Sequence, residues 1–259
     1  MFHTETLFLE NSVLVLKTQR LLNMESTNLA YWIGVAQTDG YFKKQYIKQK
    51  KLYRHQIRLN VGYCSIEMLE KFRRLSAEIF NVKGAIWYDT KRSAVEYTFG
   101  AKNLLPVFDQ LEIDFSDPPK PPQWIIQHNA YFGAYLAGVI DGDGDVRIHR
   151  PSYPQCAIRI TSGSPAIKLY NAIKKTMSIE ASLYARITNS VYQGRKIEGN
   201  CYKIEFCVSP KNIDFFEKYI ISHMAIERKR NKITGYIEKR AATENRTRIQ
   251  GSTVPYSSR

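Results

Sequence analysis

Two long apolar segments, each followed by stretches in which polar and apolar residues alternate, dominate the pattern of this chain. Residues 28–40 and 130–144 are apolar nearly all round, which predicts two helices that are buried on several sides. The segments that follow show first the period of two typical of half-buried strands and then helical periodicity. Both halves give the order α-β-β-α-β-β-α. The pattern therefore predicts an α/β (α+β) protein with two pseudo-symmetric half-domains.

A proline-rich stretch separates the two halves. Asp117–Pro122 contains four prolines in six residues, which excludes a helix or a central strand and favours an extended, semi-rigid connection. After residue 240 the chain is polar, and we expect a frayed tail. The predicted division is an N-terminal extension of open role (1–27), two half-domains (28–114 and 128–240), a linker (115–127) and a disordered tail (241–259). The second half-domain includes a basic C-terminal helix.

Charge adds a partner class to this picture. The chain has 259 residues, with Lys+Arg 38 against Asp+Glu 24 and a formal net charge of +14. The excess lies in both halves, which favours a polyanion, either nucleic acid or an anionic membrane surface. Hydrophobic residues make up 44%, which excludes a disordered chain. No apolar stretch is long enough for a membrane span, and the absence of a recognisable signal peptide leaves the compartment open. The four cysteines form no C-x-x-C pair, which argues against a zinc site.

Small residues recur at four-residue spacing in both apolar helices. Ala30 and Gly34 form one such pair, and Ala134 and Gly138 form the other. Because four residues make about one helical turn, each pair lies on one helix face. A face of small residues allows two helix backbones to approach closely. We therefore expect the two helices to pack against each other and to join the two halves.

Both apolar helices end in Asp-Gly. Gly40 and Gly144 are suited to a left-handed position after the last helical turn. If the helices pair side by side, Asp39 and Asp143 emerge together at one end. Two adjacent carboxylates repel each other unless a cation lies between them, and hard divalent ions prefer oxygen ligands. The repeat therefore predicts a divalent metal site.

These residues resemble a known family. Residues 136–144, with the sequence LAGVIDGDG, are similar to the signature of LAGLIDADG homing endonucleases, and residues 32–40 are a degenerate copy. The resemblance covers about residues 28–240 and is to the single-chain, two-motif branch. It implies a monomer in which the paired motif helices carry antiparallel sheets that form a DNA-binding saddle.

The resemblance also implies a set of site residues. Asp39 and Asp143 would bind the catalytic metal, with the carbonyl groups of Thr38 and Gly142 as further ligands. The implied ion is Mg²⁺, with Mn²⁺ as a substitute and with Ca²⁺ binding without cleavage. The family often has a lysine after the fourth strand of each half, a place that Lys102 and Lys211 hold here, and this implies a catalytic role for both.

The alternating strands predict a DNA-contacting surface. Their polar faces are rich in Arg, Gln, Asn and Thr, of which Arg, Gln and Asn form bidentate contacts with base edges, and nearby lysines suit phosphate contacts. The apolar faces predicted to be buried include Ile57, Leu59 and Val61, Val146 and Ile148, Ile158 and Ile160, and Leu183, Ala185 and Ile187. The predicted DNA-binding residues are Lys43, Lys44, Lys48, Arg54, Gln56, Arg58, Asn60, Arg147, His149, Arg159, Thr161, Tyr184, Arg186, Thr188 and Lys203.

Together these features predict a magnesium-dependent, site-specific endonuclease that cleaves double-stranded DNA at a long asymmetric target, as intron-encoded homing enzymes do. Two alternatives stay open at this point. One is an RNA maturase that assists the folding of an intron, because the fold is shared. The other is a DNA-binding regulator without catalysis, which the presence of both aspartates disfavours.

Overall fold

The computed structural model describes residues 25–150, 154–192 and 195–251, and it describes no side chain in 188–198 or 244–251. Most of the predicted N-terminal extension therefore lies outside the described residues. The first half contains α2 (Thr27–Thr38), β1 (Gly40–Ile47), β2 (Leu52–Gly62), α3 (Ile66–Phe80), β3 (Ala85–Asp89), β4 (Ala94–Gly100) and α4 (Leu105–Gln110). The second half contains α6 (Asn129–Gly142), β5 (Gly144–His149), β6 (Gln155–Ser162), α7 (Ile167–Met177), β7 (Ala181–Tyr192) and β8 (Arg195–Val208).

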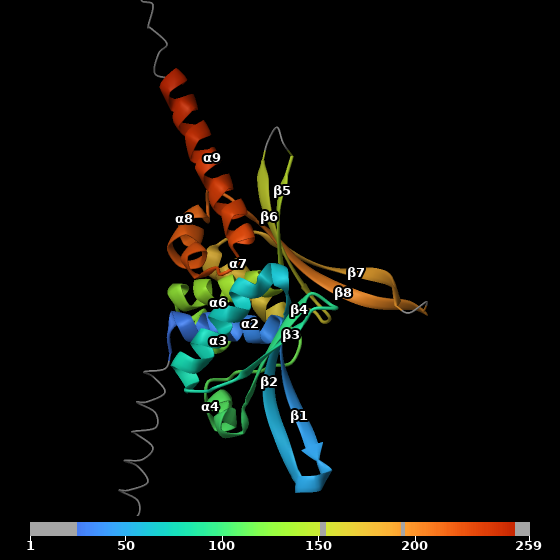
Figure 1. Cartoon of the computed structure of the whole chain (residues 1–259). Helices are drawn as coiled ribbons and strands as arrows, with labels where there is room; N and C mark the ends of the chain where they lie inside the picture. The colour runs from blue at the N-terminus through green and yellow to red at the C-terminus, as the bar shows by residue number, and fades with distance from the viewer. Residues whose placement is uncertain (1–24, 151–153, 193–194, 252–259) are drawn as a thin grey trace, which may run out of the picture.

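Each half carries one four-stranded antiparallel sheet. The strand orders are β1-β2-β4-β3 and β5-β6-β8-β7, so the two sheets have the same topology. Gly40 pairs with Leu59 in the first sheet, and Gly144 pairs with Ile160 in the second. The helices lie together in the centre of the molecule while the strands extend away from them (Figure 1). The predicted fold class, two αββαββα halves around a helix pair, is confirmed.

The centre of the fold is the close packing of α2 against α6. A Cβ atom added to Gly34 would lie 2.3 Å from the Tyr135 carbonyl oxygen, and one added to Gly138 would lie 2.3 Å from the Tyr31 carbonyl oxygen. Neither position can carry a larger residue unless the helices separate. Because the two contacts are reciprocal, the glycines set the distance between the halves, as their spacing predicts.

The glycines that follow the motif helices have a different role from the predicted one. Gly40 and Gly144 do not adopt a left-handed conformation; they begin β1 and β5. A Cβ atom would lie 2.6 Å from the Ala36 carbonyl oxygen at Gly40, and 2.4 Å from the Ile140 carbonyl oxygen at Gly144. Each strand therefore starts in contact with the last turn of its own helix, and glycine is required because of that contact.

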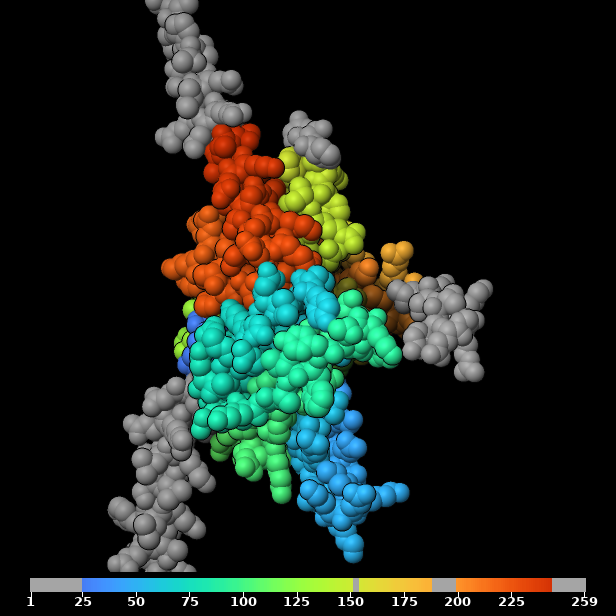
Figure 2. Space-filling view, viewed as in Figure 1, coloured from blue at the N-terminus to red at the C-terminus, as the bar shows by residue number. Residues whose placement is uncertain are grey.

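The hairpins extend past the helices that cover them. Ile57 and Leu59 on β2 are fully buried, as predicted. Ile148 on β5 is 47% exposed and Ile187 on β7 is 61% exposed, and Ala185 is also exposed, so the prediction of burial is wrong for these three. Figure 2 shows the β1–β2 and β5–β6 hairpins projecting from the body of the molecule at opposite ends. Strand alternation predicts which face a residue takes but not where the covering layer ends.

The connecting segments are more ordered than their composition predicts. The linker contains a short helix, α5 (Gln123–Ile126), and all four of its prolines are buried. The closing segment of the second half is split into α8 (Ile213–Phe215) and two further single turns.

Helix α9 (Glu227–Gly251) packs on β5 and β6 and continues well into the predicted tail. Within the described residues, no helix combines the length and hydrophobicity that crossing a membrane requires.

The helix contact gives a direct test by substitution. We expect Gly34→Ala to lower the free energy of unfolding by about 2–3 kcal/mol, because the new methyl group would overlap the backbone of α6. Gly235→Ala in α9 is the matched control, since a Cβ atom there meets no atom within 4 Å. It should leave stability unchanged or raise it by up to about 1 kcal/mol. Urea unfolding of both variants measures the difference, and equal effects would contradict the packing argument.

Candidate metal site and nucleic-acid interface

The ends of α2 and α6 bring two aspartates into one place. Asp39 and Asp143 are the C-cap residues of the two helices. The helix ends are in contact, because a Cβ atom added to Gly142 would lie 2.1 Å from the Thr38 Oγ1 atom and 3.4 Å from the Asp39 Oδ2 atom. The structure thus confirms that residues 104 positions apart in the chain share one end of the helix pair.

This position is unfavourable for two negative charges. Burial raises the pKa of Asp39 above its ordinary value, although the nearby Lys229 acts in the opposite direction. Burial also raises the pKa of Asp143 to about 7, and the negative charges of Asp39 and Asp117 add to the rise. Keeping both carboxylates ionised therefore costs free energy, which a bound cation would offset.

The donor set suits a hard divalent ion. Among the residues that the structure describes, no group of three or more His, Cys, Asp or Glu residues could hold a metal. The candidate ligands are therefore the two carboxylates and the nearby carbonyl groups. Mg²⁺ is commonly held by one or two carboxylates together with water and substrate phosphates. The residues present fit that mode of binding.

A lysine from the C-terminal helix lies beside the two aspartates. The Lys229 ammonium group donates to the carbonyl oxygens of Ile140 at 2.7 Å, Asp141 at 2.6 Å and Gly142 at 3.2 Å. Its side chain is 6% exposed, and burial lowers its pKa to about 8 even though Asp141 favours the charged form. These bonds satisfy carbonyl groups at the end of α6, where a positive charge is favourable. A metal ion at the Gly142 carbonyl would share that oxygen with Lys229.

Sequence reasoning missed Lys229 and chose two other lysines. Lys102 and Lys211 are both exposed. Gly100, just before Lys102, pairs with Gln56 of β2, whereas Gly40, which follows Asp39, pairs with Leu59. Three residues along a strand correspond to about 10 Å. The corresponding pairs in the second half, Val208 with Cys156 and Gly144 with Ile160, separate Lys211 from Asp143 in the same way. Strand register therefore places the backbone of both lysines away from the helix ends, and their catalytic role stays a prediction.

The sequence did contain a signal for Lys229, although an ambiguous one. It belongs to the basic run from Arg228 to Lys232, in which Lys229 is buried whereas Arg228 and Lys232 are exposed. A run of positive charges is usually solvated. Which of its residues faces the interior of the protein can be told only once the direction of α9 is known.

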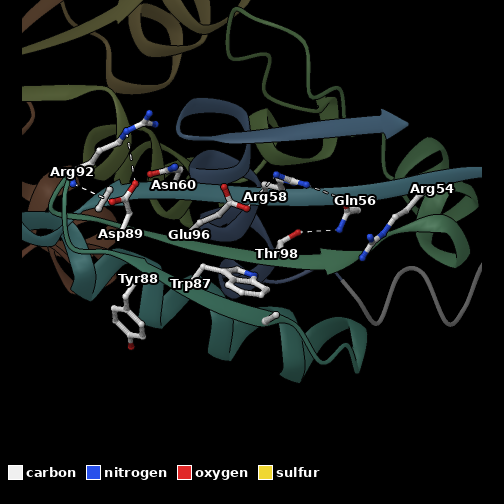
Figure 3. A pocket seen from close by; sticks show the side chains of 12 residues that line it. Arg54, Gln56, Arg58, Asn60, Trp87, Tyr88, Asp89, Arg92, Glu96 and Thr98 are labelled. Atoms are coloured by element: carbon white, nitrogen blue, oxygen red, sulfur yellow. Dashed lines mark hydrogen bonds and ion pairs between the residues drawn. The ribbon is translucent and has the colours of Figure 1, made fainter. Parts of the chain in front are cut away.

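The polar face of the first sheet forms a shallow groove. It is lined by the predicted residues of β2, together with Glu96 and Thr98 of β4 and Trp87 of β3 (Figure 3). Arg58 lies 3.3 Å from Glu96 and donates to the Gln56 side chain at 3.2 Å. Gln56 in turn donates to the Thr98 hydroxyl group at 3.4 Å. The predicted side chains Arg54, Gln56, Arg58 and Asn60 thus share one face.

The second sheet repeats this arrangement with different residues. Arg159 makes two bonds to Glu205, at 2.7 Å and 3.3 Å, and the Tyr184 hydroxyl group donates to Glu205 at 2.9 Å. Strand register places Arg159 at the position equivalent to Arg58, and Tyr184 at the position equivalent to Trp87. Trp87, which is 65% exposed, was not among the predicted contacts.

The remaining predicted contacts divide between the two faces. On β1, Lys43 pairs with Gln56 and shares the polar face, whereas Lys44 pairs with His55, so it lies on the opposite face, with its ammonium group 4.6 Å from the centre of the Tyr53 ring. Lys48 lies in the hairpin turn. The side chain of Thr188 falls outside the described residues. Alternation and register place the others on the polar face of the second sheet: Arg147, His149, Thr161, Arg186 and Lys203.

Comparisons with known proteins agree with this architecture. No family model and no curated protein matches the sequence. The meganuclease I-SmaMI bound to uncleaveable DNA has a TM-score of 0.50 and 12% sequence identity, and the match covers 84% of this chain and 90% of that chain. I-SmaMI bound to cleaved DNA has a TM-score of 0.50 and 14% identity over the same shares of both chains.

I-DmoI in complex with DNA and Mn is also similar, with a TM-score of 0.47 and 17% identity over 76% of this chain and 98% of that chain. The I-SmaMI matches span most of both chains, and I-SmaMI is described as a LAGLIDADG homing endonuclease. The fold of this chain, with two motif helices in one polypeptide, is the LAGLIDADG homing endonuclease fold.

The electrostatics of the aspartate pair predict a pH-dependent stability. The pKa of Asp143 in the folded chain, about 7, lies above the ordinary value of 3.8. Its protonated form therefore stabilises the fold below pH ~4, and this contribution is lost as the pH rises through ~7. Without divalent metal, we expect Asp143→Asn to be more stable than the wild type at pH 8 by about 1–3 kcal/mol. The two should converge at pH 4.

Urea unfolding in the presence of a chelator measures this difference. Asp214→Asn, at an exposed position in α8, is the control and should follow the wild type at both pH values. An Asp143→Asn variant with the same stability difference at pH 4 and pH 8 would contradict the proposed origin of the effect.

Proposed function

We propose that this chain is a site-specific endonuclease that cleaves double-stranded DNA with the help of a divalent metal ion, and that this ion is Mg²⁺. The observation that carries the proposal is the pairing of Asp39 and Asp143 at one partly buried helix end. A protein that used this fold only to bind DNA would gain nothing from two carboxylates held together against their mutual repulsion. I-SmaMI, whose fold this chain shares, is described bound to both uncleaveable and cleaved DNA.

The mechanism assigns distinct tasks to the residues of the site. Asp39 and Asp143 would hold the metal. When bound, the metal would polarise the phosphate and lower the pKa of a water molecule. Lys229 favours the ionised form of both carboxylates through its positive charge and so opposes the rise in their pKa that burial causes. All three of its protons already have carbonyl acceptors, so its contribution is electrostatic rather than a proton donated to the phosphate. The excess positive charge of the chain holds the duplex across both sheets.

The two sheets would provide the recognition of sequence. Their polar faces present Arg, Gln and Asn side chains that suit the major groove. Arg58 and Arg159 are held in place by Glu96 and Glu205, which limits the directions their guanidinium groups can take. Since the residues around these two arginines differ between the halves, the target would be asymmetric. We propose that one chain is sufficient, because both halves of the site are present in it.

Loss of either aspartate tests the catalytic proposal. We expect Asp39→Asn and Asp143→Asn each to lower cleavage by at least about 10³-fold while the affinity for DNA stays the same or rises, since a negative charge is removed. The substrate is a randomised duplex library incubated with Mg²⁺, and the cut ends are identified by sequencing. Binding is measured with Ca²⁺. Asp109→Asn, exposed on α4, is the matched control and should cleave like the wild type.

Three outcomes of this experiment would decide against the proposal. The first is that the wild type gives no enriched cut end. The second is that both variants cleave normally. The third is that the chain binds structured intron RNA more tightly than any duplex. The last result would favour the RNA maturase alternative.

The arginines on the two sheet faces test the recognition proposal. We expect Arg58→Ala and Arg159→Ala each to cost about 1–3 kcal/mol of binding free energy and to relax the choice of base at one position of the target. Arg73→Ala is the control, because Arg73 is exposed on α3 and pairs with Glu70 there. Uniform weakening across all sequences, with no relaxed position, would instead identify the two arginines as phosphate contacts.

A further inference from the structure

Gln37 and Asp141 hold equivalent places in the two motif helices, two residues before Asp39 and Asp143. Both side chains are buried, with 4% and 1% exposure. They are the sixth position of each motif, and they differ chemically, since one is an amide and the other a carboxylic acid. Their surroundings explain the difference and show what the position does.

The environment of Gln37 requires both a donor and an acceptor. Its amide nitrogen donates to the carbonyl oxygens of Asp114 at 2.7 Å and Lys120 at 3.0 Å. Its amide oxygen accepts from the Lys120 backbone N–H at 3.1 Å and from the Tyr135 hydroxyl group at 2.7 Å. A carboxylate could not satisfy the two carbonyl groups. Gln37 thus fastens the linker that leaves the first half.

The environment of Asp141 contains donors only. Its carboxylate accepts from the backbone N–H groups of Ala225 at 2.6 Å and Ile226 at 3.3 Å, and from the Tyr31 hydroxyl group at 2.8 Å. An amide would turn its NH₂ group towards one of these donors. Asp141 thus fastens the segment that leaves the second half, just before α9 begins.

Both anchors also cross between the halves. Tyr31 of the first motif helix bonds to Asp141, and Tyr135 of the second bonds to Gln37. A second contact supports the crossing at Asp141. The Lys71 ammonium group lies 3.6 Å from the centre of the Tyr31 ring and donates to the His223 carbonyl oxygen. The segment from His223 to Ile226 is therefore held from the first half as well as from the second.

This segment determines where Lys229 lies. Ile226 is the last residue before α9, and the Lys229 backbone N–H bonds to the Ile226 carbonyl oxygen at 3.1 Å. Lys229 is thus within one turn of the anchored residues, and its ammonium group reaches the end of α6. A shift of the anchored segment would move that charge away from Asp39 and Asp143.

We propose that Asp141 is a positioning residue for DNA cleavage, because it seats the start of α9 and so places the Lys229 charge beside Asp39 and Asp143. The inference rests on the proposed endonuclease function. It assigns to Asp141 a task that its equivalent, Gln37, does not share, since Gln37 fastens the linker and not the segment that leads to Lys229.

Asp141→Asn in the full-length chain tests the proposal. The variant keeps the shape of the side chain and mismatches one donor. We expect the single-turnover cleavage rate at saturating DNA to fall about tenfold or more, while the dissociation constant for DNA changes less than about threefold. Amide hydrogen exchange at Ala225 and Ile226 should become faster without DNA or metal. Asp214→Asn, the same change at an exposed site in the same half, should alter none of these.

A second variant guards against a general loss of folding. Tyr31→Phe removes one of the three donors to Asp141 and leaves both backbone bonds, so we expect smaller changes in the same direction. Faster exchange with an unchanged cleavage rate in Asp141→Asn would overturn the inference and leave Asp141 a structural residue. Unchanged exchange would also overturn it. A wild-type chain that cuts no duplex would overturn the proposed function and this inference with it, whereas unchanged rates in variants of an active chain overturn the inference alone.

Discussion

The close contact between the backbones of α2 and α6 is the constraint on which the rest of the molecule depends. Gly34 and Gly138 each face a carbonyl oxygen of the other helix, at a distance that leaves no room for a side chain. Because the helices meet so closely, their C-terminal ends lie in contact, and β1 and β5 each start against the last turn of their own helix. The position of both sheets relative to the candidate metal site follows from this one contact.

The same contact creates an electrostatic cost that other residues must offset. Two carboxylates at a shared, partly buried helix end are stable together only with positive charge nearby. Lys229 supplies part of that charge from α9, and its own pKa is lowered to about 8 by burial. A lysine that binds three carbonyl oxygens cannot move freely, so its charge is fixed in place. The site is therefore organised before any ligand arrives, which is the general requirement for electrostatic catalysis.

Much of this arrangement could be predicted from the sequence, because it depends on local periodicity. The small residues of the motif helices predicted their pairing, and strand alternation predicted the face of Arg58 and Arg159. What depends on the path of a distant segment could not be predicted. Lys229 reaches the carbonyl groups beside Asp143 because Asp141 and Lys71 hold the segment before α9, and the exposure of Ile187 depends on where the covering layer ends. The predicted left-handed conformation of Gly40 was wrong for a third reason. A tight turn after a helix and a strand that starts against the helix both favour glycine, so the residue type does not distinguish them.

The two halves share a topology but not a chemistry, and the differences have local causes. Gln37 stands where a carboxylate would leave two carbonyl groups without donors, so its departure from the motif is a requirement of the linker rather than a sign of decay. In the first sheet, Arg58 pairs with Glu96, which lies two residues along β4 from the position that matches Glu205 in the second sheet. Trp87 occupies the position that matches Tyr184. A symmetric target would present the same groups to both sheets. The two faces offer different donors and different aromatic rings at matched positions, which supports the proposal of a target that is asymmetric in sequence.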